Sequence, residues 1–212
     1  MEISEKKSKL RKEIRTKIRE WIRLNDLESV SKSLCDKILS LDEYKNSDVV
    51  LAYIPMKNEA DCVPAVLDAL GKGKTAAVPK CFPETSGMDF YVLQNELPLE
   101  SQLESGSYGI KEPRNFLERI DFDNSADYED KNPGETKKIS RDARIFVIVP
   151  GLAFSKDGKR LGKGKGFYDR FFEKLGKNGY KNVFLCGLCF PRQIYDDIPC
   201  GEFDRKVDLV LF

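Results

Sequence analysis

The sequence contains no histidine among its 212 residues. This absence excludes catalytic groups built on imidazole, zinc and haem sites ligated by histidine, and acid–base steps that use imidazole. The net charge is also close to zero, because the chain has 36 basic and 35 acidic residues and a formal net charge of +1. We therefore expect no nucleic-acid partner and no membrane partner, since the chain lacks the overall positive charge that attracts these anionic partners. The chemistry must use carboxylates, lysine, arginine, tyrosine, cysteine, backbone amides or a bound metal.

Long apolar runs are missing as well. No stretch approaches the ~20 residues of a membrane span, and the charged segment MEISEKKSKLRKEIR lacks the apolar core of a secretory signal. The six cysteines are scattered, and we expect reduced thiols in a cytoplasmic protein. Cys186 and Cys189 form a CxxC inside the apolar run VFLCGLCF, without a second pair to complete a zinc site. We expect them to be buried strand residues.

Apolar residues make up 41% of the chain, which is enough to bury a core. Apolar runs predict strands at 48–55, 75–79, 88–93, 144–151, 181–190 and 207–212. Helical periodicity predicts helices at 8–24, 27–41, 61–70 and 167–175. This alternation favours an α/β fold of one domain over residues 1–212, with a layered, mostly parallel sheet flanked by helices on both faces. The acidic stretch at about 118–140 breaks the rhythm, and we expect a mobile insertion without chemistry there.

Two basic residues lie on the apolar side of the first predicted helix. Its apolar positions are Leu10, Ile14, Ile18, Trp21 and Ile22. On a helical wheel Lys7 falls on the centre line of that stripe and Arg11 falls within it. Their charged heads must either reach past the end of the stripe into water or meet an anion at the edge of the interior.

The segment PGLAFSKDGKRLGKGKGFYDRFF at 150–172 carries the clearest chemical signal. A predicted buried strand is followed by a turn, and three glycines then lead directly into a helix; they are Gly162, Gly164 and Gly166. Glycine allows positive φ and close approach to a ligand, and the amides at a helix start favour an anion. Lys163 and Lys165 add positive charge. The loop is neither a Walker A motif nor GxGxxG, so it indicates a phosphate site of another kind, with a flexible hairpin tip as the alternative.

Asp169 lies at the start of the same predicted helix. A carboxylate there either interacts with the helix dipole or helps to hold Mg²⁺ on a bound phosphate. The second interpretation requires another oxygen ligand, and Asp204 and Asp208 beside the last predicted strand are candidates.

At this point the residues resemble a known family. The string RLGKGKGFYDR, preceded by PGLAF, is similar to the signature of the 5-formyltetrahydrofolate cyclo-ligase (methenyltetrahydrofolate synthetase) family. Four more segments match that family in order: KSKLRKEIR with Lys7 and Arg11, YIPMKNEAD with Glu59, SYGIKEP, and FDRKVDLVL. The chain departs from the pattern in its acidic 118–140 stretch and at Lys163, where the family often has an aromatic residue.

The resemblance implies an ATP-dependent ligase of folate one-carbon metabolism. Such an enzyme converts 5-formyltetrahydrofolate, with or without a polyglutamate tail, into 5,10-methenyltetrahydrofolate and releases ADP and phosphate. The reaction would pass through a phosphorylated formyl group, an imidate phosphate, and Mg²⁺ would accompany the ATP. We expect a monomeric, cytoplasmic enzyme.

The resemblance also assigns residues by position. ATP would be bound by Lys7, Arg11, Arg160, Leu161, Gly162, Lys163, Gly164, Lys165, Gly166, Phe167 and Tyr168. The folate would be bound by Ile54, Glu59, Lys163, Gly164, Lys165, Gly166 and Phe167. Lys163 and Lys165 are the catalytic candidates, and Asp169 and Asp204 would hold the metal. Phe167, Tyr168 and Tyr108 either stack on a ligand or anchor the core.

Two other functions stay open from the residues. The first is a sugar-phosphate isomerase or an acyl-CoA enzyme on a similar fold, which would bind phosphate without needing Lys7, Arg11 and a metal pair. The second is a non-catalytic relative that binds a nucleotide or RNA, and it should have lost one of Glu59, Asp169 or Asp204. Because all of these residues are present, the enzyme is favoured.

Overall fold

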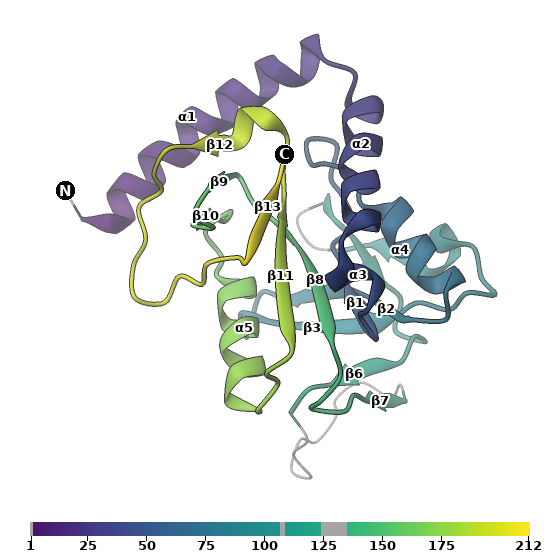
Figure 1. The fold of residues 1–212 in the computed structure, drawn as a ribbon. Helices are drawn as coiled ribbons and strands as arrows, with labels where there is room; N and C mark the ends of the chain where they lie inside the picture. The colour runs from purple at the N-terminus through teal and green to yellow at the C-terminus, as the bar shows by residue number, and fades with distance from the viewer. Residues whose placement is uncertain (1, 107–108, 124–134) are drawn as a thin grey trace.

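The computed structural model of the protein describes residues 2–106, 109–123 and 135–212. Figure 1 shows a twisted central sheet with helices around it. The helices are α1 (Ile3–Leu24), α2 (Leu27–Ser40), α3 (Asp42–Lys45), α4 (Val63–Gly71) and α5 (Phe167–Lys177), with 3₁₀ turns at Leu99–Gln102 and Pro191–Gln193. Within these described residues, no helix is both long and apolar enough to cross a membrane.

The main sheet has eight strands in the order β13-β11-β8-β1-β2-β3-β6-β7. These strands are β1 (Val49–Leu51), β2 (Thr75–Phe82), β3 (Gly87–Val92), β6 (Arg119–Asp121), β7 (Thr136–Lys138), β8 (Ile145–Pro150), β11 (Val183–Leu188) and β13 (Leu209–Leu211). From β13 to β2 all neighbours are parallel, and β3 then runs antiparallel to both β2 and β6. The predicted mostly parallel sheet is therefore confirmed.

The central strand β8 is apolar throughout because both of its faces are covered. Phe146 and Ile148 belong to the cluster beneath α2 and α4. Val147 and Val149 point to the other face and pack in the cluster that contains Phe171 of α5. Helices thus flank the sheet on both faces, as the sequence predicted.

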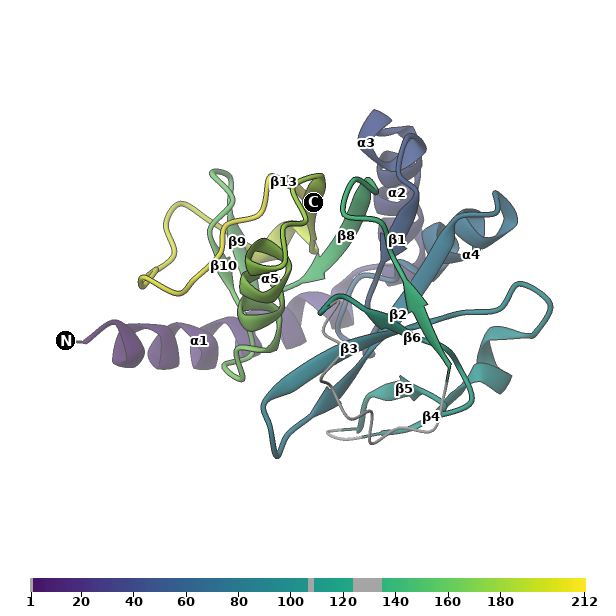
Figure 2. The ribbon, with the colours of Figure 1, turned by 90° about the horizontal axis from the view of Figure 1, so that it is seen from below.

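A second, smaller sheet lies beneath α1 and has the order β10-β9-β12. Its strands are β9 (Ala153–Ser155), β10 (Arg160–Leu161) and β12 (Ile194–Tyr195). Ile14 and Ile18 of α1 pack here against Leu152, Leu161 and Ile198. Figure 2 shows α1 as a long helix that extends past the main sheet. This packing fixes which side of α1 faces the glycine-rich loop.

The turn between β9 and β10 holds the C-terminal segment in place. Gly158 has a φ of +86°, and a Cβ there would overlap the carbonyl oxygen of Val207. The Val207 N–H donates to the Gly158 carbonyl at 2.9 Å. Glycine is required by both the backbone angle and the close approach. The contact anchors the segment that carries Asp204.

The acidic stretch was predicted to be an insertion over the whole of 118–140, and this is wrong at both ends. Residues 119–121 and 136–138 are strands of the main sheet. Ile120, Phe122 and Ile139 are buried in the core beside α5. The acidic composition concealed an apolar alternation with the period of a strand. Residues 124–134 lie outside the described residues.

Cys186, Cys189 and the Asp48–Arg144 pair have structural roles. Cys186 and Cys189 are buried, as predicted for strand residues, and burial raises the pKa of Cys186 to about 12. All six cysteines are free thiols. At the start of β1, Asp48 accepts hydrogen bonds from Arg144 at 2.6 and 3.1 Å, which lowers the pKa of Asp48 to about 2.

Candidate functional site

A cavity of about 1470 Å³ lies between α1, β10, the glycine-rich loop, the segment after β1 and the loop before β13. The cavity is lined by every residue that the family resemblance assigned to ATP, folate or the metal: Lys7, Arg11, Ile54, Glu59, Arg160, Leu161, Gly162, Lys163, Gly164, Lys165, Gly166, Phe167, Tyr168, Asp169 and Asp204. Residues from both ends of the chain thus share one cavity, although their individual roles remain predictions.

The glycine-rich loop joins β10 to α5. Gly164 and Gly166 adopt positive φ, at +101° and +69°. Gly162 was predicted to need the same freedom, which is wrong, because its φ is not in the positive region. Gly166 caps α5, and within the described chain no side chain satisfies the first amides of this helix. Amides of this kind at a helix start can accept an anion as their partner.

The basic residues on the apolar side of α1 point into this cavity. Lys7 forms an ion pair with Asp204. Arg11 donates from Nε to the Gly162 carbonyl at 2.9 Å, and its guanidinium carbon lies 3.3 Å from the place a Cβ would take at Gly164. Partial burial lowers the pKa of Arg11, and the charge of Arg15 lowers it further. Partly desolvated cations of this kind favour an anionic ligand.

Two carboxylates flank the loop. Asp169 accepts through Oδ1 from Arg160 at 2.8 Å and from the Arg205 N–H at 3.5 Å. Asp204 pairs through Oδ2 with Lys7. In each residue the other carboxylate oxygen has no hydrogen bond to any described residue.

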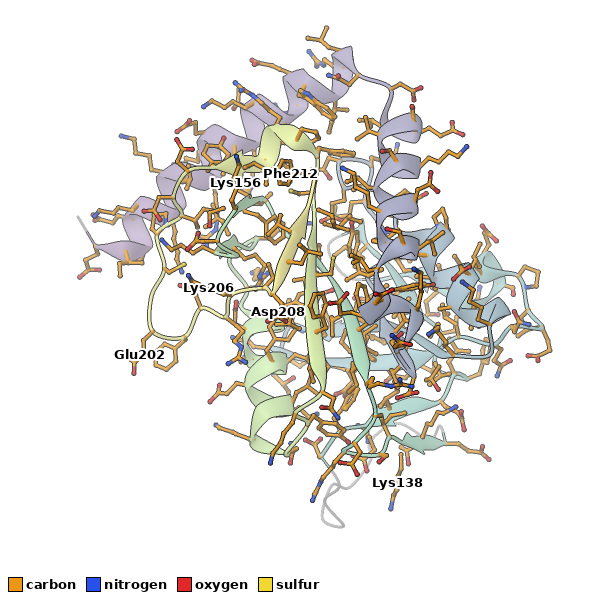
Figure 3. All side chains as sticks on the ribbon, in the orientation of Figure 1. Lys138, Lys156, Glu202, Lys206, Asp208 and Phe212 are labelled. Atoms are coloured by element: carbon orange, nitrogen blue, oxygen red, sulfur yellow. The ribbon has the colours of Figure 1, made fainter. Side chains whose placement is uncertain are left out.

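Asp208 is not part of the site. It accepts a hydrogen bond from the Leu185 N–H at 2.7 Å and so ties β13 to β11. Figure 3 places Asp208 beside β13, whereas Glu202 lies at the outer bend of the preceding loop. The candidate metal role of Asp208 is therefore replaced by a structural role.

The described residues contain no group of three or more carboxylates or thiols that could by itself hold a metal ion. Mg²⁺ bound with a nucleotide needs only one or two carboxylates, together with phosphates and water. The Oδ2 atom of Asp169 and the Oδ1 atom of Asp204, which accept no hydrogen bond from a described residue, fit that donor set.

Glu59 lies in the segment after β1 and meets the glycine-rich loop. Its Oε1 lies 2.6 Å from Lys163 Nζ, and its Oε2 accepts from the Met56 N–H at 3.0 Å. Only 10% of the Glu59 side chain is exposed. Ile54 lines the same cavity and is also part of the core. The Lys163–Glu59 pair was not predicted, because the two residues are distant in sequence.

Phe167 and Tyr168 both line the cavity and pack against the core, so they combine the two predicted roles. Arg160 lies 5.6 Å from the Tyr168 ring centre. The Tyr168 hydroxyl is buried and has no hydrogen-bond partner among the described residues. Burial raises its pKa well above the usual value. Tyr108, the third aromatic considered, lies outside the described residues.

Sequence reasoning missed some of the cavity wall. Arg15 and Arg19 line it from α1. Arg11, Arg15 and Arg19 follow one another at steps of four residues, which places all three on one side of a helix, so this signal could have found them. Glu112 also lines the cavity, and it lies in the SYGIKEP segment, which had been matched without a role.

The mostly parallel sheet covered by helices, with a basic cavity beside a glycine-rich loop, defines an α/β protein whose cavity offers positive charge and N–H donors of the kind that suit an anionic ligand. Residues 3–212 match the model of the 5-formyltetrahydrofolate cyclo-ligase family, and the chain belongs to this family of ligase enzymes.

Individual relatives agree along most of the chain. The 5-formyltetrahydrofolate cyclo-ligase of Mus musculus is 26% identical over 181 residues, which cover 84% of this chain and 80% of the relative. A probable 5-formyltetrahydrofolate cyclo-ligase of Schizosaccharomyces pombe is 29% identical over 195 residues, covering 87% and 84%. The NMR structure of Aquifex aeolicus 5,10-methenyltetrahydrofolate synthetase is similar with a TM-score of 0.66 and 28% identity, covering 96% of this chain and 88% of that one.

Proposed function

We propose that the protein catalyses the ATP-dependent cyclisation of 5-formyltetrahydrofolate to 5,10-methenyltetrahydrofolate, with release of ADP and phosphate. The observation that carries the proposal is the meeting of Lys7 and Arg11 of α1 with the glycine-rich loop in one cavity. Family membership supports the same reaction. The relatives named above are a 5-formyltetrahydrofolate cyclo-ligase and a 5,10-methenyltetrahydrofolate synthetase, and these names supply the folate substrate and product.

The ATP phosphates are proposed to bind between α1 and the start of α5. Lys7 and Arg11 supply positive charge from one side. The amides of the loop up to Gly166 supply donors from the other side, aided by the helix dipole. Arg160, Leu161, Phe167 and Tyr168 line the adjoining wall. A triphosphate would release the Lys7–Asp204 pair and replace one carboxylate partner of Lys7 with phosphate oxygens.

Asp169 and Asp204 are the residues proposed to hold Mg²⁺, each through the oxygen that has no partner among the described residues. When bound, the ion neutralises phosphate charge and orients the phosphoryl group.

The folate is proposed to lie toward Ile54 and Glu59, on the other side of the loop from Asp204. Lys163 connects the two regions, because it belongs to the glycine-rich loop and its Nζ meets Glu59 at 2.6 Å. Lys163 and Lys165 are therefore the proposed catalytic residues. Each would stabilise negative charge as the phosphoryl group moves.

The chemistry suits a site without histidine. The formyl oxygen attacks the γ-phosphorus, the bond to ADP breaks, and an imidate phosphate forms. The neighbouring anilino nitrogen then attacks the activated carbon, and its proton passes to the departing phosphate. Phosphate leaves with the former formyl oxygen, and the ring is closed. The protein holds the groups in line and excludes water from the intermediate.

We also propose that residues 1–212 act as one domain and as a monomer, since both ends of a single chain complete the cavity. The six free thiols support a reducing compartment such as the cytoplasm.

The test is turnover of 5-formyltetrahydrofolate, followed by the ultraviolet absorbance of the methenyl product, with and without ATP. We expect product only with ATP, and one free phosphate per product. Product formed equally well without ATP would overturn the proposal. Binding of ATP without any folate binding or turnover would instead favour a non-catalytic nucleotide-binding protein.

A further inference from the structure

Glu112 is a buried carboxylate that the proposed reaction does not yet use. It lies on β5 (Lys111–Pro113), which pairs with β4 (Leu103–Ser105) in a two-stranded ribbon. Only 4% of the residue is exposed, and it lines the cavity. Within the described chain, its side chain has one hydrogen-bond donor, the Cys81 N–H, at the long distance of 3.4 Å.

The ribbon makes room for this carboxylate. A Cβ at Gly106 would overlap the Glu112 side chain, so the carboxylate packs directly against the glycine backbone. No ion pair to Glu112 occurs within the described ranges. The small exposed area of Glu112 lies in the lining of the cavity, so donors beyond the Cys81 amide can reach this carboxylate from there. The missing donors are therefore expected from a ligand.

A second buried polar group lies in the same part of the cavity. The Tyr168 hydroxyl lacks a partner among the described residues. Cys81 connects the two groups, because its N–H donates to Glu112 and its side chain packs against the same core cluster as Tyr168. The Tyr168 pKa is raised by burial and then by Cys81 and Glu59. Glu59, Glu112 and Tyr168 thus all line the cavity.

The two carboxylates differ in their partners. Glu59 pairs with Lys163 and accepts from the Met56 N–H, whereas Glu112 has only the Cys81 amide. An ionised carboxylate can only accept hydrogen bonds. Its ligand must therefore present N–H or O–H donors at the edge of a group that fits between apolar and aromatic walls. The amino group and ring N–H of a reduced pterin have this chemistry.

We propose that Glu112 is a specificity-determining residue that accepts hydrogen bonds from the amino and ring N–H groups of the substrate pterin, in addition to Glu59. This inference rests on the proposed function.

The first test compares Glu112→Gln with Glu104→Gln in the full chain. Glu104 lies directly opposite Glu112 in the ribbon, pairs with Lys80 at 3.2 Å, and has a 41% exposed side chain. It is absent from the cavity lining. Binding of 5-formyltetrahydrofolate and of ATP is measured separately by calorimetry. We expect Glu112→Gln to weaken folate binding by about tenfold or more, as for a lost charge-assisted hydrogen bond, with ATP binding unchanged. Glu104→Gln should change neither.

The second test uses an analogue of the substrate that lacks the pterin amino group. The wild-type protein should bind this analogue more weakly than the substrate. Glu112→Gln should discriminate much less between the two ligands, because this variant has already lost the hydrogen bond from the carboxylate to the pterin amino group. A merely structural role for Glu112 would weaken both ligands equally and would overturn the inference, as would unchanged folate binding in Glu112→Gln.

Glu112→Asp covers the case in which Glu112→Gln does not fold. It keeps the charge but withdraws it from the cavity by one methylene group. Weaker folate binding and reduced discrimination are expected, and wild-type values for both would overturn the inference. Failure of the proposed function itself is recognisable separately, because the wild-type protein would then bind no folate at all.

Discussion

Replacement of Arg11 by alanine tests how α1 binds the nucleotide. Arg11 is partly desolvated, its pKa is lowered by burial, and its guanidinium lies against Gly162 and Gly164. A hydrogen bond to a charged partner contributes about 1.5–3 kcal/mol. Its loss should weaken ATP binding about 10- to 150-fold, since 1.4 kcal/mol corresponds to a factor of ten. Without ligand, the hydrogen bond lost within the described residues is the one to the Gly162 carbonyl, at about 1.5 kcal/mol of unfolding free energy for a charged donor.

The assay is isothermal calorimetry with ATP, combined with urea unfolding of the same samples. Arg23→Ala is the matched control, because Arg23 is exposed in the last turn of the same helix and is absent from the cavity lining. Arg23→Ala should leave ATP binding unchanged. Equal ATP affinity of Arg11→Ala and the wild type would show that α1 does not bind the phosphates. A large loss of stability with normal affinity would assign Arg11 to the fold.

Three further predictions concern the metal, the backbone and pH. Asp169→Asn and Asp204→Asn should each raise the Mg²⁺ concentration needed for half-maximal turnover, and unchanged Mg²⁺ titrations would contradict their role. Gly158→Ala should destabilise the protein by more than about 1 kcal/mol, because the φ of Gly158 is +86°. Gly176 lies in a helix with open space around it, so Gly176→Ala should stabilise the protein by up to about 1 kcal/mol. Urea unfolding measures both changes. The Asp48 pair should add less than about 1 kcal/mol, because it is exposed. The pKa of Asp48 is lowered to about 2, so this stability is full above pH ~4 and is lost as the pH falls through about 2; Asp48→Asn and the wild type should then unfold alike.

Local sequence patterns predicted the fold well for segments that are long enough to show the apolar period of a single strand or helix. The apolar run at 144–151 predicted β8, and the periodicity of 8–24 predicted α1 and the inward side of Lys7 and Arg11. The glycines before α5 predicted an anion site, because backbone freedom and helix amides are properties of that segment alone.

The missed features depend on contacts between distant segments. Lys7 and Asp204 are 197 residues apart, and no local period links them. The Lys163–Glu59 pair forms only after the glycine-rich loop packs beside the segment that follows β1. The strands β4 to β7 are each three residues long. In so short a segment, the period-two pattern of a strand cannot be distinguished from the irregular pattern of a loop. Glu112 was for this reason matched to a motif without a place in the site.

The most direct test of the central claim follows the formyl oxygen. The substrate is prepared with ¹⁸O in its formyl group and is turned over with ATP, and the released phosphate is analysed by mass spectrometry. Direct phosphorylation of the formyl oxygen predicts that the label appears in phosphate, in step with the methenyl product. Phosphate without the label, at full product yield, would contradict the proposed phosphorylated formyl intermediate.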